Sequence, residues 1–160
     1  MFSKEFKATM LIRMFGLTKI PMIWFCRPSV VEIDKDHCIL KIKLNRKTKN
    51  HLNSMYIGAL NVGADLAGGI LARELTKRSG RKLPPVFKNM QADYLKRAEG
   101  DVYFTCNEGQ KINELVHQVI DTGKRINQPV NIIATVPEKF GNEPIAKFIL
   151  TLSLKDKTNG

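Results

Sequence analysis

Asp65 stands in surroundings that are unusual for a carboxylate. It is the one formally charged side chain between His51 and Ala72, a stretch of apolar, small and uncharged polar residues. Carboxylates are almost never fully buried unless they are paired, so Asp65 either faces a cleft or bonds a basic neighbour such as Arg97. A partly desolvated carboxylate can act as a base or a nucleophile. We therefore predict that Asp65 is catalytic, with an ion pair as the structural alternative.

Two polar residues, Asn50 and His51, stand at the start of the same stretch. The first turn of a helix has backbone N–H groups without intrahelical partners, and such groups can polarise a carbonyl oxygen. An asparagine in a loop is usually a turn residue, and a loop histidine is either a base or a hydrogen-bonded structural residue. Functional and structural interpretations both stay open for these two residues.

Other chemistries lack their motifs. The three histidines are scattered, and the cysteines at 26, 38 and 106 have no CxxC spacing, so we expect neither a metal site nor a bound cofactor. Cysteines in this arrangement are typical of reduced thiols in a cytoplasmic protein. Neither a phosphate-binding glycine motif nor a GxSxG nucleophile elbow occurs.

A long helix over residues 51–79 must position Asp65. Asn53 or Ser54 would cap its start, and Gly80 would end it. The helix is apolar nearly all round, which indicates burial on most sides. A glycine costs a helix about 1 kcal/mol relative to alanine, so glycines here need a structural reason. We expect close approach of other backbone, such as a sheet wrapped around the helix. The glycines concerned are Gly58, Gly63, Gly68 and Gly69.

Alternating apolar residues predict strands on both sides of this helix. We expect the strands at residues 86–96 and 102–106 to form a hairpin, and residues 111–122 to form a second helix. A length of 160 residues and an apolar fraction of 43% fit a single domain over residues 1–160. The pattern predicts an α+β fold in which one curved antiparallel sheet surrounds one helix. Further strands are expected near residues 30–34, 40–44, 130–136 and 146–154.

Residues 1–28 form a helical and irregular N-terminal extension. A helix over residues 4–16 either packs on the domain or, because Lys7 and Arg13 make its polar face basic, anchors at a membrane surface. Charged residues and prolines interrupt the apolar runs, so the sequence predicts neither a signal peptide nor a transmembrane helix. The apolar face of this helix would consist of Phe6, Met10, Leu11 and Phe15.

Residues 50–60 and 63–69 together resemble the central-helix signature of hotdog-fold thioesterases. The closest resemblance is to an uncharacterised branch related to the phenylacetate-degradation-type acyl-CoA thioesterases. The larger family carries an Asn, a His-Gly-Gly six residues later, and an Asp nine residues after the His. Asn50, Gly58 and Asp65 match that signature at the Asn, the second Gly and the Asp.

The sequence departs from the signature at two positions, where Tyr56 replaces the His and Ile57 replaces the first Gly. Two functions therefore stay open. An acyl-CoA thioesterase is favoured by Asp65 and Asn50. A non-catalytic hotdog domain that binds acyl-CoA or an acyl chain is favoured by the two departures.

The resemblance implies a hotdog fold and hydrolysis of a thioester of coenzyme A or acyl carrier protein. The Gly58 N–H would polarise the thioester carbonyl, Asp65 would activate water or attack the carbonyl, and Asn50 would orient the water or the substrate. Hotdog domains pair through their sheets with the site between subunits, so the resemblance also implies a homodimer and leaves a tetramer open. Further substrate contacts implied are His51, Tyr56, Ile57 and Asn61.

The chain is strongly basic, with 26 Lys and Arg against 15 Asp and Glu and a net charge of +11. Such a charge favours anionic partners. No aromatic RNA-binding cluster and no arginine-rich run occurs, which disfavours nucleic acid. We expect basic residues beside the helix start to bind the phosphates of coenzyme A, with a solvated basic surface as the alternative. The candidates are Arg81, Lys82, Lys88 and Arg97.

Overall fold

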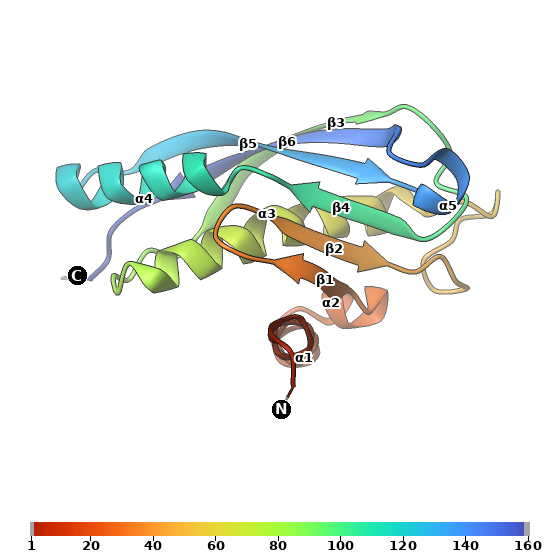
Figure 1. Ribbon diagram of the computed structural model, residues 1–160, viewed down its shortest axis with the longest axis horizontal. Coiled ribbons are helices and arrows are strands. Elements are labelled where there is room, and N and C mark those ends of the chain that lie inside the picture. The colour runs from red at the N-terminus through yellow and green to blue at the C-terminus, as the bar shows by residue number, and fades with distance from the viewer. Residues whose placement is uncertain (1, 159–160) are drawn as a thin grey trace.

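An antiparallel sheet of six strands packs against one long helix in the computed structural model, which describes residues 2–158 (Figure 1). The strand order is β1-β2-β4-β5-β6-β3, so β1 and β3 are the two edges. The long helix is α3 (Ile57–Arg78). This arrangement confirms the predicted α+β architecture. The strands are β1 (Ser29–Ile33), β2 (Cys38–Ile42), β3 (Val86–Tyr94), β4 (Val102–Cys106), β5 (Ile126–Thr135) and β6 (Pro144–Leu154).

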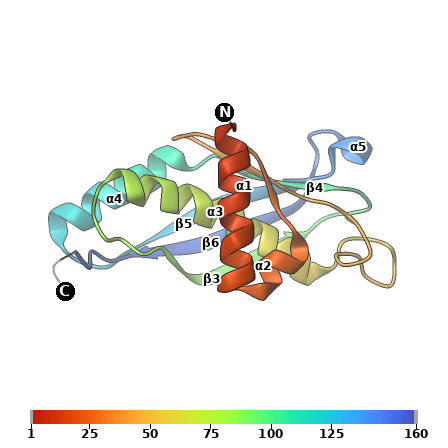
Figure 2. The ribbon, with the colours of Figure 1, turned by 90° about the horizontal axis from the view of Figure 1, so that it is seen from below.

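Four further helices surround this core. The helix α4 (Gly109–Thr122) confirms the helix predicted at 111–122, and Gly123 ends it in the left-handed conformation with φ of 65°. The helix α1 (Lys4–Thr18) and the short α2 (Pro21–Cys26) form the N-terminal extension, and α5 (Pro137–Phe140) is a single turn before β6. Figure 2 shows α1 on the outside of the molecule, in front of α3.

The glycines of α3 make room for aromatic rings rather than for backbone, which corrects the expectation. A Cβ atom at Gly63 would lie 2.3 Å from the ring of Phe104 on β4. At Gly68 it would lie 3.2 Å from Phe87 on β3. Because the sheet curves around the helix, its inward-pointing rings reach the helix surface where no side chain stands. Phe104 is completely buried by this contact.

The central helix begins at Ile57, later than the predicted start at residue 51. Residues 50–54 form a turn instead, because the side-chain oxygen of Asn50 accepts hydrogen bonds from the N–H groups of Leu52 at 2.9 Å and Ser54 at 3.2 Å. Asn53 has a φ of 59°, a left-handed conformation that an α-helix cannot contain. Neither Asn53 nor Ser54 is therefore the N-cap, which falls on Tyr56.

The predicted hairpin between residues 86–96 and 102–106 is wrong. β3 pairs with β6, whereas β4 lies between β2 and β5. The connection between β3 and β4 is held away from a tight turn by two contacts. The N–H of Leu95 donates to the carbonyl of Ile145 at 2.8 Å, and the N–H of Met55 donates to the carbonyl of Ala98, also at 2.8 Å.

The helix α1 is attached to β1 by polar contacts on its inner side. The hydroxyl of Thr9 accepts a hydrogen bond from the N–H of Val30 at 2.8 Å. The guanidinium of Arg13 donates to the carbonyl of Pro28 at 3.1 Å and to the Ser29 hydroxyl at 2.8 Å. The extension therefore packs on the domain, which is one of the two predicted alternatives. It packs through Thr9, Ile12 and Gly16, whereas the predicted apolar face is exposed. Among residues 2–158, no helix combines the length and the hydropathy needed to cross a bilayer.

Candidate active site

Asp65 lies on the wall of an apolar cavity of about 360 Å³ between the N-terminal extension and α3. One wall comes from α1 and α2, through Ile12, Phe15 and Ile23. The other comes from α3 and the start of β3, through residues that include Phe87. The cavity is open to solvent, so the carboxylate of Asp65 is exposed although the helix around it is buried.

The Asp65 carboxylate has neither a salt bridge nor a hydrogen bond with any residue that the structure describes. The predicted alternative, an ion pair with Arg97, is not formed. Because the walls of the cavity displace water around the carboxylate, desolvation raises the pKa of Asp65 above its ordinary value of 3.8. An unpaired carboxylate with a raised pKa is a better proton acceptor than an ordinary surface aspartate.

The first turn of α3 presents backbone donors. No side chain caps the N-terminus of α3 in the part of the chain that the structure describes. The N–H groups of Ile57 and Gly58 therefore lack intrahelical partners. Tyr56 is exposed, and its ring lies beside Gly58, where a Cβ would be 2.6 Å from the Tyr56 Cε1 atom. These N–H groups, together with the positive end of the helix dipole, can stabilise an anionic or polarised oxygen.

Asn50 and His51 precede this turn, and the side chain of Asn50 makes hydrogen bonds that hold the local backbone in place. Its side-chain oxygen is the acceptor that shapes residues 50–54, and it also accepts from the Ser54 hydroxyl at 3.3 Å. The oxygen is therefore engaged, and the NH2 end of the amide is the part that remains for a ligand. His51 is exposed in the same turn.

Along α3, the face that carries Gly58, Asn61 and Asp65 lies next to the edge strand β3. The hydroxyl of Tyr94, at the end of β3, donates to the Asn61 side-chain oxygen at 2.6 Å. Phe87, near the start of β3, contacts the helix beyond Asp65. Asp65 therefore stands beside a strand whose outer edge has no partner within residues 2–158.

Gly58 and Asp65 are widely separated along α3 for two groups that would act on one carbonyl group. They are seven positions apart on α3, which corresponds to about 10 Å along the helix axis at 1.5 Å per residue. A carbonyl group at about 3 Å from the Gly58 N–H and a water on Asp65 would have to span this distance in a nearly straight line, which the angles at a carbonyl disfavour.

The four basic residues predicted to bind coenzyme A are not brought together. Arg81 and Lys82 follow the C-terminal end of α3, and Arg81 is paired with Asp156 at 2.5 Å. Arg97 lies at the other end of the helix, next to Ala98, which is hydrogen-bonded to the residue before Tyr56. Lys88 is exposed on the edge strand β3. Within one chain, the expected cluster beside the helix start therefore consists of Arg97 alone among the four.

A cluster that offers metal ligands lies elsewhere, on the β1–β2 hairpin. One ligand atom from each of Glu32, Asp34 and His37 falls within 4.8 Å of the others. The His37 nitrogens contact Glu32 at 3.0 Å and Asp34 at 3.1 Å. Asp34 also accepts hydrogen bonds from the N–H groups of Asp36 and His37, which lower its pKa. Because these side chains contact one another and the backbone of the turn, the structure of the β1–β2 hairpin is enough to explain the cluster.

Three contributors to the site are not predicted from the sequence: Tyr94, Phe87 and the cavity wall from α1 and α2. Tyr94 and Phe87 lie on a strand that was predicted to pair in a hairpin, so nothing in the local pattern placed them against α3. The sequence does contain a signal for the packing of α1, because Thr9, Ile12 and Gly16 lie on one face of the helix. That face is the buried one.

Comparison with known proteins identifies a family and several solved structures of similar fold. Residues 8–145 match the family described as a domain of unknown function, DUF4442. A search of curated proteins finds no match. A Pseudomonas aeruginosa protein of unknown function, named a probable thioesterase, is similar in structure with a TM-score of 0.74 at 22% identity, over 92% of this chain and 95% of that one.

Two further solved structures are similar over nearly their whole length. A protein of unknown function from Chlorobaculum tepidum has a TM-score of 0.79 at 14% identity, over 94% of this chain and 96% of that one. Zebra fish thioesterase superfamily member 2 has a TM-score of 0.67 at 14% identity, over 97% of this chain and 99% of that one. At these identities the likeness establishes the fold, which is the hotdog fold expected from the residues of α3. The chain belongs to the DUF4442 family.

Proposed function

We propose that this protein hydrolyses an acyl thioester of coenzyme A or acyl carrier protein, at a site shared between two copies of the chain. The observation that carries the proposal is the unpaired carboxylate of Asp65 on the wall of an apolar cavity. The cavity offers an acyl group an apolar surface, and the carboxylate offers a proton acceptor beside it. The structural similarity to thioesterases supports the same reaction class. The phenylacetate-degradation-type branch is proposed only from the resemblance of the α3 residues.

The reaction follows from the groups on α3. The thioester carbonyl oxygen accepts a hydrogen bond from the Gly58 N–H at the helix N-terminus, which stabilises the negative charge that develops there. The Asp65 carboxylate takes a proton from water as the water oxygen bonds to the carbonyl carbon. The tetrahedral intermediate then collapses, the carbon–sulfur bond breaks, and the sulfur leaves as a thiol after taking up the proton. The products are a carboxylic acid and the free thiol.

A partner copy would bring a second Gly58 close to Asp65. The edge strand β3 is long and has an open edge, which is a surface that proteins normally cover. A second β3 paired with it would bring the partner's α3 to the face that carries Asp65. The exposed apolar residues near this edge, Val86, Tyr94 and Leu95, would then be covered. We propose a homodimer with two equivalent sites, each with Gly58 from one copy and Asp65 from the other.

Asp65→Asn tests the catalytic role. The amide keeps the shape of the side chain but cannot accept a proton at neutral pH, so hydrolysis should fall on the order of 10²–10⁴-fold. Desolvation raises the pKa of Asp65, so the ionised form is the less favourable one in the folded state. Its contribution to stability is present below the unfolded pKa and is lost as the pH rises through the folded pKa. Asp65→Asn should therefore keep or raise the melting temperature at pH 7.

The assay is release of free thiol from a panel of acyl-CoA thioesters, together with thermal unfolding. The matched control is Asp121→Asn, which makes the same change at an exposed position on α4. In the unmodified protein, the rate should fall as the pH drops through the pKa of Asp65, with a midpoint above 3.8. Full activity of Asp65→Asn would exclude Asp65 as the base.

A non-catalytic acyl-binding domain is the second candidate, and one observation favours it. The exposed ring of Tyr56 lies beside Gly58, over the turn that would hold the carbonyl oxygen. If the ring keeps the carbonyl away, the cavity would bind an acyl thioester without turning it over. Saturable binding of an acyl-CoA with no thiol release, by both the unmodified protein and Asp65→Asn, would identify this second function.

A further inference from the structure

The outer surface of α1 and α2 is apolar to an extent not found elsewhere on the described chain. Of twenty exposed large hydrophobic side chains, eleven lie between residues 2 and 25. Two of these, Phe15 and Ile20, also line the cavity of Asp65. We call the remaining nine the N-terminal face. Its members are Phe2, Phe6, Met10, Leu11, Met14, Leu17, Met22, Trp24 and Phe25.

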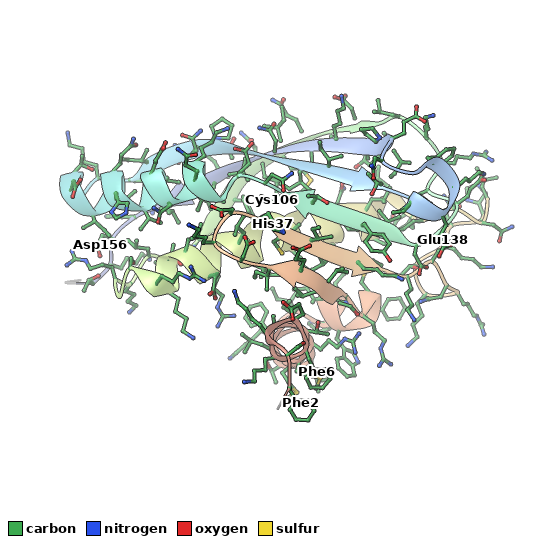
Figure 3. The ribbon with its side chains drawn as sticks, in the orientation of Figure 1. Phe2, Phe6, His37, Cys106, Glu138 and Asp156 are labelled. Carbon is green, nitrogen blue, oxygen red and sulfur yellow. The ribbon has the colours of Figure 1, made fainter. Side chains whose placement is uncertain are left out.

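The N-terminal face is fixed in orientation. Phe6, Met10 and Met14 follow one another at a spacing of four residues, which places them in a single row along α1. The opposite side of α1 is buried and attached to β1 through Thr9. Figure 3 shows Phe2 and Phe6 at the outer side of α1, directed away from the sheet. The two rings stack on each other, with centroids 4.7 Å apart.

The segment that carries this apolar surface is rich in positive charge. Residues 2–28 contain five basic side chains and one acidic one, Glu5. The guanidinium of Arg27 lies 5.8 Å from the Trp24 ring, and the ammonium of Lys47, from the loop after β2, lies 5.4 Å from the Phe25 ring. The basic residues of this segment are Lys4, Lys7, Arg13, Lys19 and Arg27.

We propose that the N-terminal face binds the surface of an anionic lipid bilayer. A helix that lies in the membrane interface buries Phe, Leu and Trp on one side and carries Lys and Arg beside them. The helices α1 and α2 have this composition, and α1 lies on the outside of the molecule (Figure 2). Tryptophan at such a boundary places its ring among the headgroups. The cations around the face complement anionic headgroups at the same depth.

A second copy of the chain fits the same face poorly. In a twofold contact, the face would meet itself, and Lys7, Lys19 and Arg27 would be brought against the same charges of the other copy. Residues 2–28 offer a single acidic residue, Glu5, to offset them. The bilayer is therefore the better complement. The proposal does not depend on whether Asp65 is catalytic, because its test measures lipid binding.

The chain contains one tryptophan, and this tryptophan lies on the face, so its fluorescence reports binding directly. We expect the emission of Trp24 to shift to shorter wavelength with vesicles of phosphatidylcholine and phosphatidylglycerol. The protein should also sediment with these vesicles. Pure phosphatidylcholine vesicles should bind much less, and added salt should release the protein from the anionic ones.

Two pairs of charge reversals separate a local effect from net charge. Lys7→Glu with Lys19→Glu changes the face, and Lys124→Glu with Lys155→Glu makes the same change in net charge at exposed positions remote in sequence. A lysine near an anionic surface contributes about 1 kcal/mol, so the first pair should weaken vesicle binding by roughly 30-fold or more. The second pair should leave binding within a few-fold of the unmodified protein.

A matched pair of polar substitutions tests the apolar part. Met10→Gln with Met14→Gln should reduce binding and the shift of Trp24. Ile133→Gln with Ile149→Gln, on the sheet at similar exposure, should not. Equal binding to neutral and anionic vesicles, or equal losses for the two charge-reversed proteins, would overturn the proposal. It would also be overturned if vesicles fail to bind and light scattering shows that the Met10 and Met14 changes dissociate an oligomer, since a second copy would then cover the face.

Discussion

Mixing two inactive variants tests whether the site is shared between copies. Asp65→Asn removes the proton acceptor. Gly58→Val adds a branched side chain at the first turn of α3, where a Cβ would already lie 2.6 Å from the Tyr56 ring. The ring or the new side chain then occupies the space in front of the Gly58 N–H. Each variant alone should therefore hydrolyse thioesters on the order of 10²-fold more slowly, or slower still.

The magnitude expected of the mixture follows from the geometry of α3. In the proposed dimer, each site takes Gly58 from one copy and Asp65 from the other, because about 10 Å of helix separates the two residues within one chain. In a mixed dimer, one site combines the intact Gly58 of the first variant with the intact Asp65 of the second, and the other site has both changes. If the two variants associate at random, half of the dimers are mixed and half of their sites are intact, so about a quarter of full activity should return.

The assay is thiol release after the two purified variants are dissociated together and refolded together. Each variant refolded by itself is the control for recovery, and thermal unfolding shows that each one folds. A mixture no more active than the two variants apart would show that Gly58 and Asp65 act within one chain, and the proposed shared site would be wrong. Activity proportional to the product of the two variant concentrations would support it.

Two further predictions concern the core. Gly63→Val should lower the melting temperature, with an overpacking cost of about 1–3 kcal/mol, because a Cβ there would lie 2.3 Å from the Phe104 ring. Gly69→Ala is the control and should be neutral or stabilising, since its nearest contact is 3.6 Å away; equal effects in thermal unfolding would contradict the packing explanation. Burial raises the pKa of Cys38 to about 12 and that of Cys106 to about 11, so a thiol reagent at pH 8 should label them only after unfolding. Labelling is measured by mass spectrometry, and rapid labelling of the native protein would show that β2 and β4 open readily.

The fold was largely predictable because its periodic signals are strong. The alternating apolar residues of β2, β5 and β6 and the small residues of α3 led to the correct layers. The pairing of β3 was not predictable from the local pattern. It depends on contacts of Phe87 and Tyr94 with residues of α3 that are remote in sequence. The start of α3 was misplaced, since Asn53 and Ser54 resemble caps but belong to a turn organised by Asn50.

For the site, Asp65 could be found because a lone charge in an apolar helix is visible in the sequence. Its apolar cavity could not, because the cavity depends on how α1 and α2 pack against α3. The basic residues predicted to bind coenzyme A do not lie together, for a related reason. Arg81 was near the helix in sequence, yet α3 is long enough to carry it to the far end, where Asp156 pairs with it.

The position of β6 has a consequence for how the protein is made. β6 lies between β5 and β3, and Val86 at the start of β3 pairs with Ser153. During translation, β3 therefore emerges from the ribosome well before the strand it needs. Until β6 arrives, β3 with Phe87 has no strand through which to join the sheet, and pairings between such distant segments form slowly. A nascent chain halted before residue 144 should consequently expose an unclosed apolar interior and be a target for chaperones.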